Sequence, residues 1–138
     1  MCTYRRSVLF AVTALCIFAC AADAQNRSPL FTFLGESAGA EFGAAVTRLD
    51  GPVPLLAVGA PGEGVGGAVH VFELRGGQKV VSFVSAHAGE RFGHALVAAP
   101  DLNGDGTEDL WIGAPERGGG RGAVYAYSTA SMTARYRV

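Results

Sequence analysis

The same series of short motifs occurs twice in this chain, and this repetition constrains the fold more than any other feature of the sequence. Three motifs recur in the same order, at offsets of 50, 54 and 55 residues. The recurring pairs are Phe42-Gly43 with Phe92-Gly93, Gly59-Ala60-Pro61 with Gly113-Ala114-Pro115, and Gly67-Ala68-Val69 with Gly122-Ala123-Val124. The change in offset after the first pair indicates a four-residue insertion in the second copy. The sequence therefore predicts two copies of one supersecondary unit.

Each copy contains short apolar or alternating segments that are typical of β-strands. Residues 67–74 and 122–128 alternate with a period of two, and residues 55–59 and 110–113 are compact apolar runs before Ala-Pro. Residues 42–48 and 92–98 are predicted to form the first strands, and residues 79–85 and 133–138 the fourth. Glycine clusters separate the second strand from the third. Four antiparallel strands in about 50 residues are typical of a β-propeller blade.

These motifs resemble the FG-GAP repeats of integrin alpha subunits and of related extracellular proteins, and the resemblance covers residues 31–138. It implies an all-β protein built from antiparallel four-stranded blades of β-propeller type. The family forms seven-bladed rings, whereas this chain has two repeats, so a partial propeller is predicted. We expect repeat 1 to span residues 25–84 and repeat 2 to span residues 85–138. The phenylalanine of each Phe-Gly pair is expected to fill the space between sheets, and Trp111 is expected to pack in the core.

The insertion in the second copy is an acidic loop that reads Asp101-Leu-Asn-Gly-Asp-Gly-Thr-Glu-Asp109. Oxygen-bearing side chains stand at its first, third, fifth and ninth positions, and Gly106 permits a sharp turn. Such spacing suits Ca²⁺, which prefers six to eight oxygen ligands. The predicted ligands are Asp101, Asn103, Asp105, Thr107 (through its carbonyl) and Asp109.

Two comparisons define the kind of calcium loop. An EF-hand requires a glutamate at position 12, where this chain has Ile112 within a strand-like run. The resemblance to the FG-GAP calcium hairpin fits better, because all five liganding positions match. The first copy is four residues shorter here and retains only Asp50 of the acidic set. We therefore predict no metal in repeat 1.

The N-terminus has the pattern of a secretory signal peptide at residues 1–24. Arg5 and Arg6 precede an apolar run, and Ala22-Asp23-Ala24 is a small-x-small cleavage site. The predicted mature chain is secreted, starts at Gln25, has no transmembrane span and contains no cysteine, because all three cysteines lie upstream. A lipid anchor at Cys20 is the alternative, since residues 17–20 loosely resemble a lipobox.

One alternative function is that of a serine hydrolase fragment. Gly35-Glu-Ser37-Ala-Gly39 matches the G-x-S-x-G nucleophile elbow, with Asp50 as a candidate acid and a histidine among residues 70, 87 and 94. The repeat aligns Ser37 with His87, so the shared pattern does not require a serine there. The mature chain is also short for a hydrolase sheet with a distant triad.

We therefore expect a non-enzymatic, calcium-binding extracellular module for cell adhesion or for binding a protein or glycan ligand. The calcium ion is expected to be structural. A net charge of −1 without a basic cluster argues against binding to nucleic acid. Because a blade buries its faces only against neighbours, further repeats or self-assembly are expected as well. A bare scaffold repeat without a partner is a third possibility.

Overall fold

The computed structural model describes residues 29–130 and 133–137 and divides the chain into two compact units, residues 1–32 and 33–138. Of the first unit, residues 29–32 are described, and they form no helix or strand. The predicted signal peptide, its cleavage site and Cys20 lie outside the described residues.

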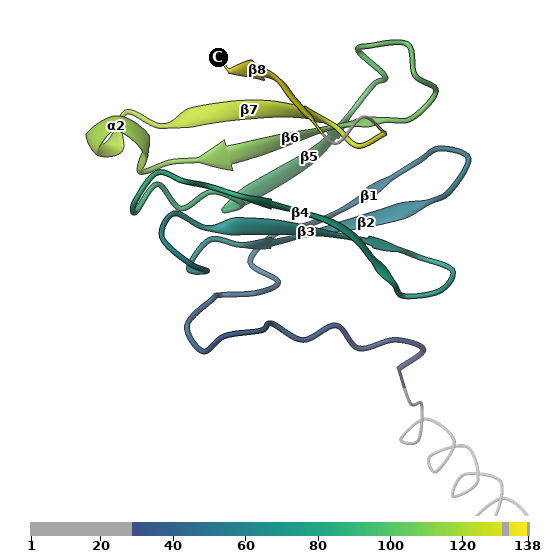
Figure 1. Ribbon diagram of the computed structural model, residues 1–138, viewed down its shortest axis with the longest axis horizontal. Helices are drawn as coiled ribbons and strands as arrows, with labels where there is room; N and C mark the ends of the chain where they lie inside the picture. The colour runs from purple at the N-terminus through teal and green to yellow at the C-terminus, as the bar shows by residue number, and fades with distance from the viewer. Residues whose placement is uncertain (1–28, 131–132, 138) are drawn as a thin grey trace, which may run out of the picture. The chain divides into compact units, whose positions relative to one another are not determined.

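The second unit contains two four-stranded antiparallel sheets, each with its strands in sequence order (Figure 1). The first sheet consists of β1 (Val46–Leu49), β2 (Leu55–Ala60), β3 (Ala68–Glu73) and β4 (Lys79–Val84). The second consists of β5 (Ala95–Ala99), β6 (Asp109–Ala114), β7 (Ala123–Ser128) and β8 (Thr133–Arg137). A short turn of helix, α2 (Arg117–Gly120), joins β6 to β7. The predicted all-β fold is confirmed, and each sheet has the meander topology of a propeller blade.

The two sheets repeat one another in detail as well as in topology. The register of β3 against β4 shifts between Val71 and Phe72, and that of β7 against β8 shifts between Ala126 and Tyr127. These two bulges lie at equivalent positions, 55 residues apart. The loop between β1 and β2 comprises residues 50–54, whereas the loop between β5 and β6 comprises residues 100–108. The four-residue insertion predicted from the sequence therefore lies in this second hairpin.

The hydrophobic core lies between the facing sides of the two sheets (Figure 1). The first sheet contributes Leu55, Ala57, Val69, Val71 and Phe83, and the second contributes Leu96, Leu110, Ile112, Ala114 and Tyr125. Phe92 is 1% exposed and packs edge-on against Tyr125. The prediction that this phenylalanine fills the space between sheets is confirmed for the second repeat.

Two sequence predictions about local structure are wrong. The first strands begin at Val46 and Ala95, which lie three and two residues after the glycines of the Phe-Gly pairs and not at the phenylalanines. The residues before these pairs, Glu41 and Arg91, have φ angles of 54° and 56°, so the chain turns sharply at each pair instead of extending.

The other wrong prediction concerns Trp111, which is 46% exposed and is not part of the core. Alternate residues of β6 point to opposite sides of the sheet. Leu110 and Ile112 face the first sheet, so Trp111 faces away from it.

Candidate metal loop

The acidic hairpin between β5 and β6 is organised around the carboxylate of Asp101. Its Oδ1 accepts hydrogen bonds from the backbone N–H groups of Gly104 at 2.7 Å, Asp105 at 3.1 Å and Asn103 at 3.2 Å. Its Oδ2 accepts a bond from the N–H of Gly106 at 2.7 Å. Both loop glycines have positive φ angles, 76° at Gly104 and 86° at Gly106, which a side chain would disfavour. The backbone of the loop therefore wraps around one acidic side chain.

These hydrogen bonds stabilise the ionised form of Asp101. The bond from the Gly106 N–H is the largest cause of the lowering of the Asp101 pKa below its ordinary value of 3.8, and the other N–H donors act in the same direction. A hard cation such as Ca²⁺ binds carboxyl groups in their ionised form, so the lowered pKa of Asp101 favours cation binding.

Asp105 connects the loop to the C-terminal end of strand β7. Its Oδ2 accepts a hydrogen bond of 2.8 Å from the hydroxyl of Ser128, at the end of β7, and its Oδ1 accepts one of 3.0 Å from the N–H of Thr107. The Ser128 bond is the main reason that the pKa of Asp105 is lowered. Asn103 supports the same residue, because its Oδ1 accepts a bond of 2.9 Å from the Asp105 N–H.

Asp109 differs from the other two aspartates because it is buried. The residue is 4% exposed, and its Oδ2 accepts a hydrogen bond of 2.8 Å from the N–H of Leu102. Its Oδ1 has no hydrogen-bond partner, the sole such buried side-chain atom identified among residues 29–130. A buried carboxylate oxygen without a partner is costly unless something neutralises it, so this atom fits a cation at the loop.

The structure brings the predicted ligands into one hairpin, but their side chains do not all converge on one point. Within the part of the chain that the structure describes, no three acidic, histidine or cysteine side chains lie close enough to hold a metal ion. The side-chain oxygens of Asp101, Asn103 and Asp105 accept hydrogen bonds mainly from backbone N–H groups, and the donors to Asp105 include the N–H of Thr107. The donor chemistry fits Ca²⁺, and the ligand set remains a prediction.

The corresponding loop of the first repeat has no such cluster. Its one acidic residue, Asp50, pairs with the guanidinium of Arg48 at 2.7 Å. The two loops are instead joined to each other. The N–H of Asp50 donates a hydrogen bond of 2.7 Å to Glu108 Oε2, and the N–H of Glu108 donates one of 3.1 Å to the Asp50 carbonyl.

Ser128 and Glu108 support the loop and were not identified from the sequence. Ser128 lies 23 residues after Asp105, and Glu108 contacts a residue 58 positions away. Neither separation has a local sequence signal.

Ser37, the candidate nucleophile, does not lie in the local structure that a nucleophile elbow requires. It lies in a turn, where its carbonyl accepts a hydrogen bond of 3.3 Å from the Ala40 N–H. The next regular element is strand β1, not a helix. An elbow places its serine between a strand and a helix, so the geometry here does not support hydrolase chemistry at Ser37.

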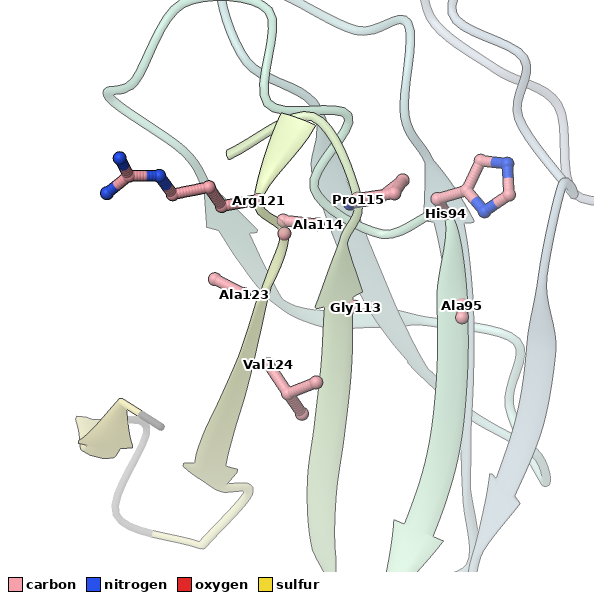
Figure 2. Close-up of a pocket in the computed structure, with 9 residues that line it drawn as sticks. His94, Ala95, Gly113, Ala114, Pro115, Arg121, Ala123 and Val124 are labelled. Carbon is pink, nitrogen blue, oxygen red and sulfur yellow. The ribbon is translucent and has the colours of Figure 1, made fainter. Parts of the chain in front are cut away.

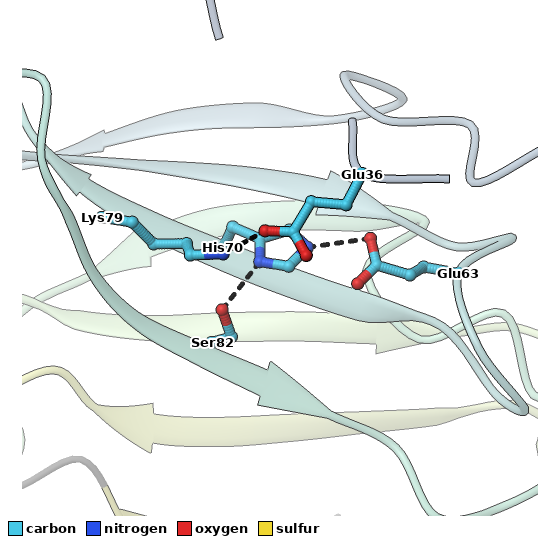
Figure 3. Close-up of polar contacts among 5 residues, drawn as sticks. All are labelled: Glu36, Glu63, His70, Lys79 and Ser82. Carbon is cyan, nitrogen blue, oxygen red and sulfur yellow. Dashed lines mark hydrogen bonds and ion pairs between the residues drawn. The ribbon is translucent and has the colours of Figure 1, made fainter. Parts of the chain in front are cut away.

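A different polar cluster, on the first sheet, joins a serine, a histidine and a glutamate (Figure 3). His70 Nδ1 lies 2.7 Å from Ser82 Oγ, and His70 Nε2 lies 2.9 Å from Glu63 Oε2. Glu36 and Lys79 form an ion pair beside it. The second repeat has Tyr125 at the position of His70, and the tyrosine hydroxyl donates to the buried carboxylate of Glu90. A buried polar bridge therefore occurs at this position in both repeats, which favours a structural role.

The fold and the loop together define two consecutive repeats of propeller-blade type, with an acidic hairpin in the second. Residues 92–127 match the FG-GAP repeat family. The chain therefore contains an FG-GAP repeat, and it is distantly similar to the N-terminal region of integrin alpha subunits.

The similar curated proteins are much longer than this chain. It is 36% identical to human integrin alpha-10 over 107 residues, which cover 67% of this chain and 9% of that protein. It is 33% identical to mouse integrin alpha-M over 117 residues, or 75% of this chain and 10% of that protein. It is 38% identical to mouse integrin alpha-3 over 110 residues, which cover 70% of this chain and 10% of that protein. The chain thus spans about a tenth of the length of these relatives. Among the described residues, no helix has the length and apolar character needed to cross a membrane.

Proposed function

We propose that this chain is an extracellular FG-GAP module that binds one calcium ion at Asp101–Asp109, presents a surface to a protein or glycan ligand, and catalyses no reaction. The observation that carries the calcium site is the buried Oδ1 of Asp109, which has no hydrogen-bond partner among the described residues. It lies in the same hairpin as Asp101 and Asp105, whose carboxyl pKa values are lowered.

The residues that would hold the ion are Asp101, Asn103, Asp105, the Thr107 carbonyl and Asp109. Ca²⁺ supplies positive charge that offsets the repulsion of three carboxylates on one hairpin. Ser128 would position Asp105 for this role, since its hydroxyl contacts one oxygen of that carboxylate. The result would be a hairpin fixed in register with β5, β6 and β7, so the calcium is structural and not catalytic.

The extracellular and adhesive parts of the proposal rest on other observations. The signal-peptide pattern of residues 1–24 supports secretion, and the similarity to integrin alpha subunits supports an extracellular module. FG-GAP repeats of this type are typically non-enzymatic. The turn at Ser37 also lacks the context of a nucleophile elbow.

Thermal unfolding of the full chain in chelator and in calcium tests the metal site. Extracellular calcium modules have dissociation constants of about 10⁻⁴–10⁻³ M. At about 10 mM calcium, such a site stabilises the fold by about 1.4–2.7 kcal/mol, because the ion binds the folded loop and not the unfolded chain. We expect the melting temperature to rise by roughly 5–15 °C.

Two aspartate variants make this test specific. Asp105→Asn should remove most of the calcium effect, whereas Asp50→Asn, in the shorter loop of the first repeat, should leave it intact. Magnesium at the same concentration should have a smaller effect, because it prefers octahedral sites and retains its water. Equal effects of the two variants, or a calcium effect that magnesium reproduces, would argue against the proposed site.

A further inference from the structure

The contact between the two repeats depends on the Phe92-Gly93 turn, which docks closely on the first sheet. The N–H of Phe92 donates a hydrogen bond of 2.8 Å to the Gly66 carbonyl, and Phe92 forms an isolated parallel bridge with Gly67. A Cβ atom at Gly59 would lie 2.0 Å from the carbonyl oxygen of Gly93. Small residues on the first sheet therefore form the receptor for this turn.

The second sheet has an equivalent receptor on the face that points away from the first sheet. No described residue is docked in this receptor. A groove of about 460 Å³ lies at the positions that correspond to the docking site on the first sheet. Gly113 stands at the position of Gly59, and Gly122 at the position of Gly67. Figure 2 shows residues that line the groove: Ala95 lies on β5, Gly113 on β6, and Val124 on β7.

Space for an incoming backbone is present at Gly122 of this groove. A Cβ at Gly67 would lie 2.3 Å from the Phe92 carbonyl oxygen, whereas the nearest atom to a Cβ at Gly122 is the Pro115 oxygen, at 3.5 Å. Gly122 also has the same kind of backbone conformation as Gly67, with φ angles of 78° and 101°.

The exposed side chains around the groove occupy core positions in the first sheet. Ala57 and Val69 are fully buried under the second sheet. Their equivalents, Trp111 and Val124, are 46% and 44% exposed. The face of the second sheet that bears them thus has the composition of an interface between repeats.

The chain itself carries a turn of the right shape to fill this groove. Phe42 packs edge-on against Phe72 of its own sheet, with 6.3 Å between the ring centroids. Phe92 packs against Tyr127 in the same way, with 5.9 Å between the ring centroids. Gly43 and Gly93 have φ angles of 92° and 89°. A Cβ at Gly93 would lie 2.5 Å from the Ala68 oxygen, whereas a Cβ at Gly43 would have no atom of the described residues within 4 Å. Among the described residues, the Phe42-Gly43 turn therefore has no docking partner at Gly43.

Charge supports a second copy of the chain as the source of the turn. Within one chain, Arg91 precedes the docked turn and pairs with Glu41, which precedes the other turn, at 2.6 Å. If a second copy docked its Phe42-Gly43 turn on the second sheet by the same geometry, its Glu41 would approach Arg91. Arginine presents five donors and can bind two carboxylates. Glu41 and Arg91, which each precede a Phe-Gly turn, would then alternate along the row of docked repeats.

We propose that this chain associates head to tail, with the Phe42-Gly43 turn of one copy docked in the groove of the second sheet of another. One position departs from the pattern. Arg121 stands where the first sheet has Gly66, whose Cβ would lie 2.0 Å from the His87 oxygen. Arg121 leaves no room for such a close approach. In the second copy, the residues before Phe42 must therefore lie farther from Arg121 than His87 lies from Gly66.

Sedimentation equilibrium of the full chain over a range of concentrations tests this proposal. We expect association that strengthens with concentration, and Val124→Lys should raise the dissociation constant about tenfold or more, because it buries a charge without a partner. Val80→Lys is a matched control: Val80 is 42% exposed, much as Val124 is, but lies on β4, the outermost strand of the first sheet, away from the groove. Thermal unfolding of each variant would establish that the fold is retained.

A charge exchange distinguishes this interface from unspecific aggregation. Glu41→Arg alone should weaken association, and Glu41→Arg combined with Arg91→Glu should restore it, since the pair is rebuilt both within and between copies. A monomeric wild-type chain at high concentration would overturn the proposal and leave a further repeat as the occupant of the groove. Equal effects of Val124→Lys and Val80→Lys would overturn it as well.

Discussion

The hydroxyl of Tyr125 donates a hydrogen bond of 3.0 Å to the carboxylate of Glu90, one of the most deeply buried charged groups in the described part of the chain. The Ser85 hydroxyl also donates to this carboxylate, and the guanidinium of Arg117 lies 3.5 Å from it. Burial raises the pKa of the neighbouring Tyr127, and the charge of Glu90 adds to this effect. Glu90 thus connects β7, α2 and the segment after β4.

Replacing Glu90 should destabilise the fold more than most single substitutions. Glu90→Ala removes the acceptor shared by three donors in a buried site, and we expect a loss of about 3 kcal/mol in the free energy of unfolding. Glu90→Gln retains the shape and one acceptor, so its loss should be smaller. Chemical denaturation of both variants measures this difference, and equal stabilities of wild type and Glu90→Ala would contradict the role assigned to the carboxylate.

Gly59 and Gly113 occupy equivalent positions but should differ in their tolerance of a methyl group. Gly59→Ala places Cβ 2.0 Å from the Gly93 carbonyl oxygen. Because both atoms belong to backbone segments, this clash can be relieved only by moving the Phe92-Gly93 turn away from the first sheet. We expect a loss of about 3 kcal/mol, at the upper end of overpacking effects. At Gly113 the nearest atom is the Ala95 Cβ at 3.2 Å, so Gly113→Ala should cost far less. Denaturation midpoints of the two variants test this, and a reversed order would show that the interface is assigned wrongly.

The acidic loop should lose its internal stabilisation in acid. Since N–H donors lower the pKa of Asp101 in the folded chain, its contribution is fully present above the unfolded value near 3.8 and is lost as the pH falls through the lower folded value. We therefore expect Asp101→Asn to be less stable than wild type at pH 7 in chelator. This difference should shrink as the pH falls below about 4. Urea denaturation at several pH values measures it, and a difference that stays constant with pH would be inconsistent with the hydrogen bonds described.

The prediction for the N-terminus concerns processing. The Ala22-Asp23-Ala24 site should be cleaved, so that the secreted chain starts at Gln25. Intact-mass analysis of the secreted protein checks this directly. A lipid-modified chain that starts at Cys20 would instead support the anchored alternative.

The repeated sheets could be predicted from sequence because their signals are local. Period-two alternation, glycine clusters and the recurring Phe-Gly and Gly-Ala-Pro motifs identify strands and turns within a few residues of one another. The hairpin insertion was predicted correctly for the same reason. The five predicted calcium ligands are likewise adjacent in sequence, and their assignment to calcium remains to be measured.

The errors and omissions come from contacts between distant residues. The alternation in β6 shows that Trp111 and Leu110 point to opposite sides, but not which side another sheet covers. The left-handed conformation of Glu41 and Arg91, which moves the start of β1 and β5, has no signal in those side chains. Ser128, which contacts Asp105, could be found only once the strands were assembled.

A calorimetric titration of calcium into the full chain tests the central claim most directly. The account predicts one site per chain, with a dissociation constant of about 10⁻⁴–10⁻³ M. Asp109→Asn should weaken binding strongly, because it replaces the buried oxygen that lacks a partner, and Asp50→Asn should leave the isotherm unchanged. No detectable binding at millimolar calcium would contradict the account, as would two sites per chain.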